Sequence, residues 1–139
     1  MRVLLVDDSG TVLGMMKALL EQMGHTVAVA KDGDAGLEVI ADFEPDVVVC
    51  DLKMPRMNGL QVVRAVRDRS ATLPVIIFTD EADVPRAVEA MKEGAYSYVV
   101  KGSPVERLAE EIEAAFAQKN RLERARALER EREKEKLRS

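Results

Sequence analysis

The stretch DVVVCDLKMPRMNG, residues 46–59, decides which fold this chain adopts. It opens with a short apolar run, Asp46 to Cys50, rich in β-branched valines, and a run of this length indicates a buried strand. Asp51 follows the run directly. Asn58, with Gln61 three residues later, has the pattern of a capping box, which marks the start of a helix. A buried strand, a polar strand end and a helix start therefore succeed one another in this short segment.

The same pattern recurs on both sides of this stretch. Amphipathic segments with helical spacing alternate with four further apolar runs, at residues 3–6, 26–30, 74–78 and 96–100. Gly24 and Gly94 stand where helices commonly end, and Ser103 with Glu106 predicts a capping box before the last helix. Parallel strands need crossovers, which helices supply. The sequence therefore predicts an α/β fold: a doubly wound five-stranded parallel sheet with helices on both faces and an extended last helix.

Composition narrows the classes of function. The 139 residues suit one compact core, and a net charge of −4 offers no broad cationic surface for nucleic acid or anionic lipid. No apolar run approaches the roughly 20 residues that span a bilayer. Cys50 is the only cysteine, so we expect no intramolecular disulfide, a reducing cytoplasmic location and a core position for this side chain. His25, the only histidine, is expected in an exposed turn, and its isolation argues against zinc or histidine-based catalysis.

Polar residues follow four of the predicted strands directly. They are Asp7 and Asp8, Asp51, Thr79 and Lys101. Because the carboxyl ends of parallel strands meet at one crevice, we expect these side chains to form a single cluster. Carboxylates about 4 Å apart repel by roughly 4 kcal/mol at an effective dielectric constant near 20, so the cluster needs a cation. Lys101 is one candidate, and Mg²⁺ is the other, because it accepts a few carboxylate oxygens and retains water in its remaining positions.

Such a cluster supports phosphoryl transfer to a carboxylate. A carboxylate beside Mg²⁺ and a lysine can attack phosphorus, because the cations neutralise charge on the transferring phosphoryl oxygens. The sequence has neither GxxxxGK[ST] nor a GxGxxG after a strand, so it contains no recognisable nucleotide-binding loop. The donor is therefore expected to be a ready-made phosphoryl carrier, such as another protein.

The order of these motifs resembles the response-regulator receiver family of two-component signalling, over roughly residues 1–118. The motifs are Asp7-Asp8, Asp51-Leu-Lys-Met-Pro55 with Asn58-Gly59, then Thr79, then Tyr98-Val-Val-Lys101. The resemblance implies a flavodoxin-like receiver fold whose Asp51 accepts a phosphoryl group from a sensor histidine kinase or a histidine phosphotransfer protein. It also implies a signalling module that catalyses only its own phosphotransfer and dephosphorylation, and not an enzyme.

By the same resemblance, the strand-end residues divide the work at the site. Asp8 and Asp51 would bind Mg²⁺ through their side chains, and the main-chain carbonyl of Lys53 would be a further ligand. Asp7 would act on the ion mainly through water. Lys101 would pair with one phosphoryl oxygen.

The resemblance also implies a two-state switch. Thr79 would hydrogen-bond a second phosphoryl oxygen, which would draw its loop inward and let Tyr98 move from an exposed to a buried position. The output face would then consist of the fourth helix, the fifth strand and the fifth helix.

The last predicted helix carries the chain beyond the minimum length of the family. Nothing between Pro104 and Arg138 breaks a helix, and about 35 residues at 1.5 Å each extend roughly 50 Å. Residues 121–138 include thirteen charged residues among eighteen. Only a thin apolar stripe remains, made of Leu122, Ala125, Leu128 and Leu137. We therefore divide the chain into a receiver domain, residues 1–118, and a charged helical extension, residues 119–139, leading to a second copy in a homodimer or to an effector domain.

Charge pairs are expected to support this extension as an exposed helix. Glu123 with Arg126, and Glu131 with Lys134, place opposite charges three residues apart, which stabilises a helix by tenths of a kcal/mol, roughly 0.2–0.5 per pair. From residue 120 onward, eight basic and five acidic residues give a net charge of only +3, which disfavours nucleic-acid binding.

Two other functions are alternatives to the receiver. A haloacid-dehalogenase-like phosphohydrolase carries a second aspartate two residues after its nucleophile, where this chain has Lys53. A receiver-shaped scaffold that is not phosphorylated is the other alternative, and it rests on two departures from the family pattern. Asp80, followed by Glu81, replaces a usually small residue, and Gly102 replaces a common proline. A cis bond before a non-proline residue costs about 2.5–4 kcal/mol, so we expect the Lys101–Gly102 bond to be trans.

The carboxylate of Asp80 is expected to slow labelling by small anionic phosphodonors, because it adds negative charge at the mouth of the site. Replacement by alanine, Asp80→Ala, should therefore increase the initial rate of labelling, measured by intact-mass spectrometry in the presence of Mg²⁺. Equal rates for the variant and the wild type would contradict this explanation.

Overall fold

The sheet and its connections account for most of the chain. The computed structural model describes residues 1–80 and 82–138. Glu81, which follows Asp80 in the departure from the family pattern, lies outside the described residues. The strands are β1 (Arg2–Val6), β2 (Thr26–Ala30), β3 (Val47–Cys50), β4 (Val75–Thr79) and β5 (Ser97–Val100). The helices are α1 (Gly10–Gln22), α2 (Gly33–Phe43), α3 (Gly59–Arg69), α4 (Val84–Glu93) and α5 (Val105–Arg138). The five predicted runs agree with the five strands to within one residue at each end.

The five strands form one sheet in the order β2-β1-β3-β4-β5, and every neighbouring pair is parallel. The predicted fold class is therefore confirmed. The chain moves from β1 outward to β2 and then returns to the other side of β1 to form β3. This change of direction leaves a crevice at the carboxyl ends of β1 and β3, which is where parallel α/β sheets place their ligands.

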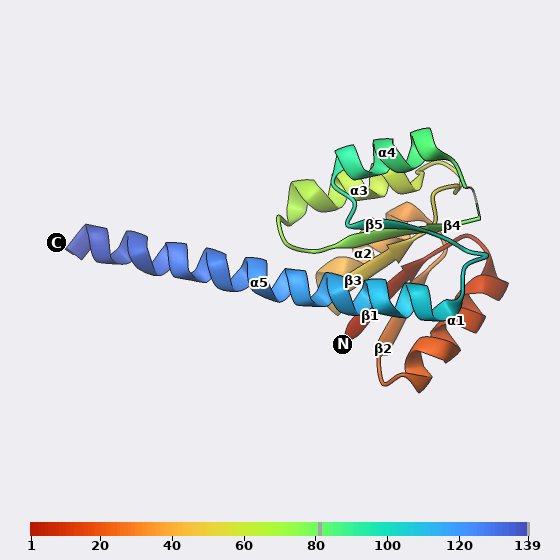
Figure 1. The fold of residues 1–139 in the computed structure, drawn as a ribbon, viewed down its shortest axis with the longest axis horizontal. Coiled ribbons are helices and arrows are strands. Elements are labelled where there is room, and N and C mark those ends of the chain that lie inside the picture. The colour runs from red at the N-terminus through yellow and green to blue at the C-terminus, as the bar shows by residue number, and fades with distance from the viewer. Residues whose placement is uncertain (81, 139) are drawn as a thin grey trace.

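Helices cover both faces of the sheet (Figure 1). Alternate residues of the strands point to opposite faces, so each strand contributes to two cores. One core packs α1 and α5 on the sheet, with Leu13, Leu20, Leu108 and Ile112 buried against Val3, Val49 and Ile76. The other core packs α2, α3 and α4, with Leu37, Leu60, Val63 and Ala90 buried against Val6, Val48 and Ile77. The site residues therefore start from strands that are held from both sides.

Local signals set most of the helix ends as predicted. Asn58 and Gln61 form a complete capping box at α3, and Gly94 ends α4 with φ +107°. Gly24, with φ +94°, follows the last turn of α1. The predicted capping box at Ser103 was wrong, because α5 begins at Val105 and the residue preceding it is Pro104.

The prediction for His25 was also wrong. Its side chain is only 9% exposed, and its Nδ1 lies 3.3 Å from the amino nitrogen of Met1. Burial lowers the pKa of His25, the positive amino terminus lowers it further, and Glu113 on α5 partly opposes both effects. The sequence placed this residue in a turn, but the turn packs against α5.

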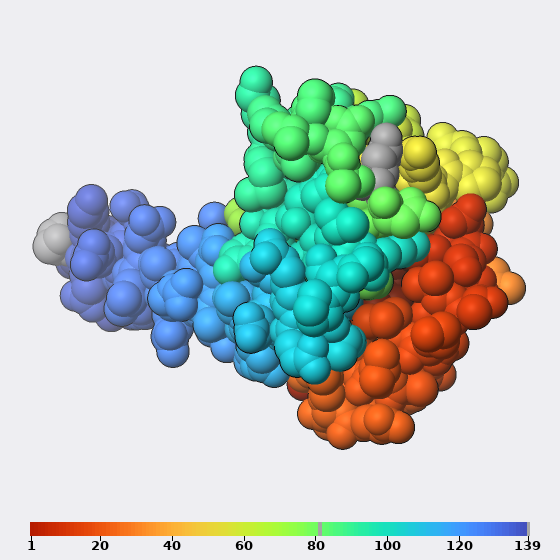
Figure 2. Space-filling view, turned by 45° about the vertical axis from the view of Figure 1, so that its right-hand side comes forward, coloured from red at the N-terminus to blue at the C-terminus, as the bar shows by residue number. Residues whose placement is uncertain are grey.

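The extension of α5 projects from the body of the molecule as a lone helix (Figures 1 and 2). Every described residue from 121 onward is exposed, and the tail pairs Glu131 with Lys134 at 3.5 Å, as predicted. Glu123 pairs with Lys119, at 3.0 Å, and not with the expected Arg126. Among the described residues, no helix has the length and apolar character that crossing a membrane requires.

Gly59, the first residue of α3, packs closely against the backbone of the loop after β3. A Cβ atom at this position would lie 2.5 Å from the carbonyl oxygen of Asp51 and 2.9 Å from Cα of Leu52. We expect Gly59→Ala to lower the free energy of unfolding by about 1–3 kcal/mol, because the backbone of the loop would have to move. Gly14→Ala is the matched control: it lies in a helix with open space around it, and should gain about 0.5–1 kcal/mol. Chemical denaturation measures the free energy of unfolding of both variants. An unchanged value for Gly59→Ala would show that the loop after β3 can move at little cost.

Candidate functional site

Backbone hydrogen bonds fix the loops that carry the predicted site residues. The amide of Asp51 donates to the carbonyl of Val6 at 2.9 Å, and the amide of Lys101 donates to the carbonyl of Thr79 at 2.7 Å. Both bonds continue the parallel ladder beyond the ends of the strands. The structure thereby brings Asp7, Asp8, Asp51, Thr79 and Lys101 to one edge of the sheet, as the sequence predicted.

Lys101 neutralises the acidic side of this cluster. Its Nζ lies 2.7 Å from Oδ2 of Asp7 and 3.5 Å from Oδ2 of Asp51. The other oxygen of Asp7, Oδ1, accepts a hydrogen bond from the backbone amide of Ser9 at 2.9 Å. Asp7 is therefore held at both oxygens, whereas Asp8 is exposed at the surface.

The three carboxylates form a set that suits a hard divalent cation. Asp7, Asp8 and Asp51 each offer an oxygen, and these oxygens all lie within 4.8 Å of one another. Mg²⁺ prefers oxygen ligands and commonly keeps water in the positions that a protein leaves open. Asp8 is the carboxylate most accessible to an ion, because it is exposed, whereas both oxygens of Asp7 already have partners.

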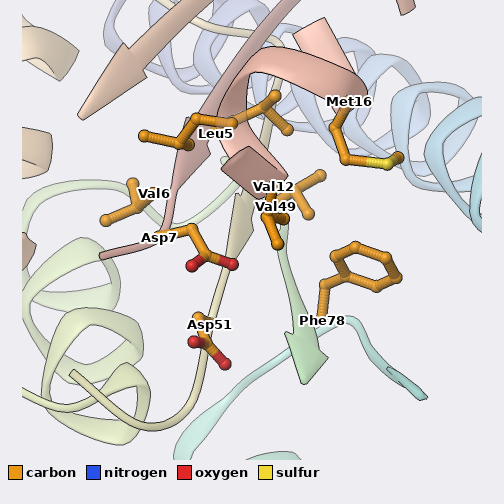
Figure 3. A pocket seen from close by; sticks show the side chains of 9 residues that line it. Leu5, Val6, Asp7, Val12, Met16, Val49, Asp51 and Phe78 are labelled. Atoms are coloured by element: carbon orange, nitrogen blue, oxygen red, sulfur yellow. The ribbon is translucent and has the colours of Figure 1, made fainter. Parts of the chain in front are cut away.

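Burial shapes the acidity of Asp51. The residue is only 7% exposed, and Figure 3 shows its side chain near that of Asp7, below the apolar side chains of Val12 and Val49. A cavity of about 10 Å³ lies between α1 and the sheet beside the two carboxylates, with Phe78 and Met16 in its wall. Burial raises the pKa of Asp51; the charge of Lys101 opposes this, and that of Asp7 adds to it.

Lys101 remains a cation in this environment. Burial by itself lowers the pKa of Lys101, but the hydrogen bond to Asp7 and the charges of Asp51 and Asp7 outweigh it, so the pKa is raised overall. The ring of Phe78 lies 5.9 Å from Nζ, which adds a weak cation–π contact. A positive charge is therefore fixed next to Asp51.

The remaining predicted residues lie around this centre. Thr79 is fully buried, and its side chain hydrogen-bonds Asp51, which favours the ionised carboxylate. Lys53 lies in the loop after β3, beside Asp8. Tyr98 on β5 is half-buried and packs against the core that α2, α3 and α4 cover.

Cys50, Asp80 and Gly102, which are the neighbours of Asp51, Thr79 and Lys101 in the sequence, can also be compared with the predictions. Cys50 is fully buried, as predicted, and burial raises the pKa of its thiol, which leaves it unreactive. Asp80 is exposed directly after β4. The bond between Lys101 and Gly102 is trans, as predicted.

Three residues that lie around this site were not predicted from the sequence. The amide of Ser9 orients Asp7, the ring of Phe78 flanks Lys101, and the side chain of Arg86 lines a crevice that also includes Asp8 and Lys53. Only Arg86 had a signal in the sequence, as a cation in the first turn of the helix after the fourth strand. The contacts of Ser9 and Phe78 arise from the folded chain alone.

A family model and two known regulatory proteins match the sequence of this chain. A sequence model of the response regulator receiver domain matches residues 3–113. The regulatory protein AtoC of Escherichia coli (strain K12) is 38% identical over 100 residues, which cover 72% of this chain and 22% of that protein. The transcriptional regulatory protein ZraR of Salmonella typhimurium is 34% identical over 115 residues, which cover 83% of this chain and 26% of that protein. This chain therefore spans about a quarter of the length of these relatives.

A solved structure gives the same result for the fold. The crystal structure of a response regulator receiver domain protein from Clostridium thermocellum superimposes with a TM-score of 0.82 at 34% identity. The superposition covers 87% of this chain and 98% of that one.

Ionised Asp51 should destabilise the metal-free protein. Its pKa is raised on folding, so ionised Asp51 lowers the stability of the native state at any pH above that pKa. We expect Asp51→Asn to raise the melting temperature at pH 7 in EDTA by roughly 3–5 °C. The difference should shrink as the pH falls through the native pKa towards the ordinary value of 3.8, because Asp51 of the wild type then becomes neutral.

Calorimetry of the two proteins at several pH values tests this expectation. Asp68→Asn is the matched control, because Asp68 is an exposed aspartate on α3. Mg²⁺ should stabilise the wild type and the control more than Asp51→Asn. Equal melting temperatures for all three proteins in EDTA would show that the charge of Asp51 is already balanced.

Proposed function

Because the chain belongs to the response-regulator receiver family, we propose that it accepts a phosphoryl group on Asp51, with Mg²⁺, and transmits that event to a partner. The observation that carries this proposal is the position of Lys101, whose Nζ lies between Asp7 and Asp51 at 2.7 and 3.5 Å. A fixed cation next to one buried carboxylate is what an attack on phosphorus requires, because charge develops on the phosphoryl oxygens.

Each residue of the site has its own role in the proposed phosphoryl transfer. An oxygen of Asp51 attacks phosphorus, and the bond from phosphorus to the leaving group of the donor breaks. Lys101 pairs with one phosphoryl oxygen, and its hydrogen bond to Asp7 holds it in place meanwhile. Asp8, Asp51 and the carbonyl of Lys53 would hold Mg²⁺, with Asp7 acting through water. When bound, the ion supplies further positive charge at the phosphoryl oxygens.

The switch follows from the same residues. Thr79 hydrogen-bonds Asp51 in this structure, and we propose that its hydroxyl turns to a phosphoryl oxygen once Asp51 is modified. Tyr98 is half-buried, so a modest inward movement would bury it and alter the surface formed by α4, β5 and α5. Val84, Val88 and Met91 are exposed on that surface, which gives it the apolar character of a contact site.

The partners follow from the same proposal. The donor would be a sensor histidine kinase or a histidine phosphotransfer protein, which places the chain in the cytoplasm, where kinases have access to ATP. The relatives AtoC and ZraR are regulatory proteins several times longer than the matched segment. We propose that residues 1–118 are the receiver domain, and that residues 119–139 connect it to an effector domain or to a second copy of the chain.

The central test is intact-mass spectrometry after incubation with a small phosphodonor, or with a phosphorylated histidine protein, with and without Mg²⁺. We expect the mass of one phosphoryl group to be added only in the presence of Mg²⁺. Asp51→Asn should lose the label, whereas the exposed control Asp68→Asn should keep it. Failure of both kinds of donor would contradict the proposal and favour a receiver-shaped scaffold.

Dimerisation through the extension is tested separately by light scattering at high concentration, with and without a phosphoryl mimic. We expect the mimic to favour a dimer, and Leu128→Glu to weaken it, because Leu128 is 60% exposed on the thin apolar stripe. Ala127→Glu adds the same charge at a neighbouring position off that stripe and should have little effect. A monomer under all conditions would count against this contact.

A further inference from the structure

The crevice beside the acidic cluster has two different walls. One wall is the loop after β3, with Lys53 and the cap residue Asn58, and the other is the first turn of α4, with Arg86. Asp8 also lines this crevice. In the space-filling view, the loop after β3 (yellow) and the start of α4 (green) lie on the same rim of the molecule (Figure 2).

Arg86 is positioned by its helix, and its side chain remains available. The backbone amide of Arg86 donates to Oδ1 of the cap residue Asp83 at 3.2 Å, which fixes where the side chain leaves α4. The side chain is half-buried and lines the crevice. Its guanidinium forms no ion pair within residues 1–80 and 82–138, whereas Arg64 and Arg56 are paired with Glu93 and Asp32.

The geometry of phosphoryl transfer directs the leaving group away from Asp51. In an in-line displacement, the leaving group lies on the side of phosphorus opposite the attacking oxygen. Asp51 is only 7% exposed, and the apolar side chains between α1 and the sheet, such as Val12 and Val49, close one side of it. Asp8 has an oxygen within 4.8 Å of one of Asp51, is exposed, and also lines the crevice with Asn58 and Arg86, so a leaving group that departs outward past Asp8 passes this crevice.

Within the part of the chain that the structure describes, the charged residues that line this crevice are Asp8, Lys53 and Arg86. Asp8 is exposed, and its carboxylate would repel a departing anion. Lys101 lies deeper, held by Asp7 and Asp51. The guanidinium of an arginine is planar and can bind both oxygens of a carboxylate at once, which a lysine cannot do.

We infer that Arg86 is a specificity-determining residue, which favours phosphodonors whose leaving group is a carboxylate over donors whose leaving group is neutral. With an acyl phosphate, the bond between phosphorus and the acyl oxygen breaks, and its electron pair stays on the departing carboxylate. With phosphoramidate, the bond between phosphorus and nitrogen breaks, and neutral ammonia departs. In both cases the new bond joins phosphorus to an oxygen of Asp51. This inference rests on the proposed function.

The experiment compares initial rates of labelling by acetyl phosphate and by phosphoramidate, followed by intact mass at fixed Mg²⁺. The quantity of interest is the ratio of the two rates in each protein, because a general effect on Asp51 cancels in it. We expect Arg86→Gln to lower this ratio by about fivefold, the effect of losing one favourable charge contact. Arg86→Lys, which keeps the charge but not the paired geometry, should fall between Arg86→Gln and the wild type.

Lys92→Gln is the matched control, because it removes one positive charge from the exposed last turn of the same helix. Its rate ratio should equal that of the wild type. An unchanged ratio in Arg86→Gln, or an equal fall in Lys92→Gln, would overturn the inference while leaving phosphorylation of Asp51 intact. Absence of label on the wild type with both donors and with a phosphohistidine protein would instead overturn the proposed function.

Discussion

The contact between Lys101 and the two carboxylates of Asp7 and Asp51 is the interaction on which the site depends. Three carboxylate oxygens within 4.8 Å of one another would otherwise repel strongly at the edge of the sheet. Lys101 comes from the far end of the sequence, 94 residues from Asp7, and joins the ends of β1 and β5 across the sheet. In the proposed transfer, the same cation would meet the charge of an incoming phosphoryl group.

That contact is possible only because the sheet is parallel and buried on both faces. Neighbouring strands end together at the crevice where the strand order changes direction, between β1 and β3. The close approach of Gly59 to the backbone of Asp51 and Leu52 fixes the loop that follows β3. The positions of Asp51, Thr79 and Lys101 therefore follow from the packing of whole strands, and small shifts of one strand would alter all the contacts among them.

Most of the strands and helices, and the fold class, could be predicted because they depend on residues that are close together in the sequence. Short β-branched runs, helical spacing and the capping box at Asn58 report conformations that the chain prefers nearby in sequence, and the fold class followed from their alternation. The order of Asp7, Asp8, Asp51, Thr79 and Lys101 along the chain also indicated one cluster, because parallel strand ends converge. The capping box at Ser103 and the surroundings of His25 were predicted wrongly, because α5 begins after Pro104 and His25 lies near Glu113 on that helix.

The sequence by itself determined the fold class, the identity of the strand-end residues and the long charged helix, since hydrophobic periodicity and charge pattern are properties of neighbouring residues. Only the tertiary structure decided how those residues meet. It gave Asp7 two partners, buried Thr79 beside Asp51, and brought Arg86 and Asn58 to the same crevice. These arrangements join residues that are distant along the chain, and their energies depend on distance, burial and charge in three dimensions, which no local pattern encodes.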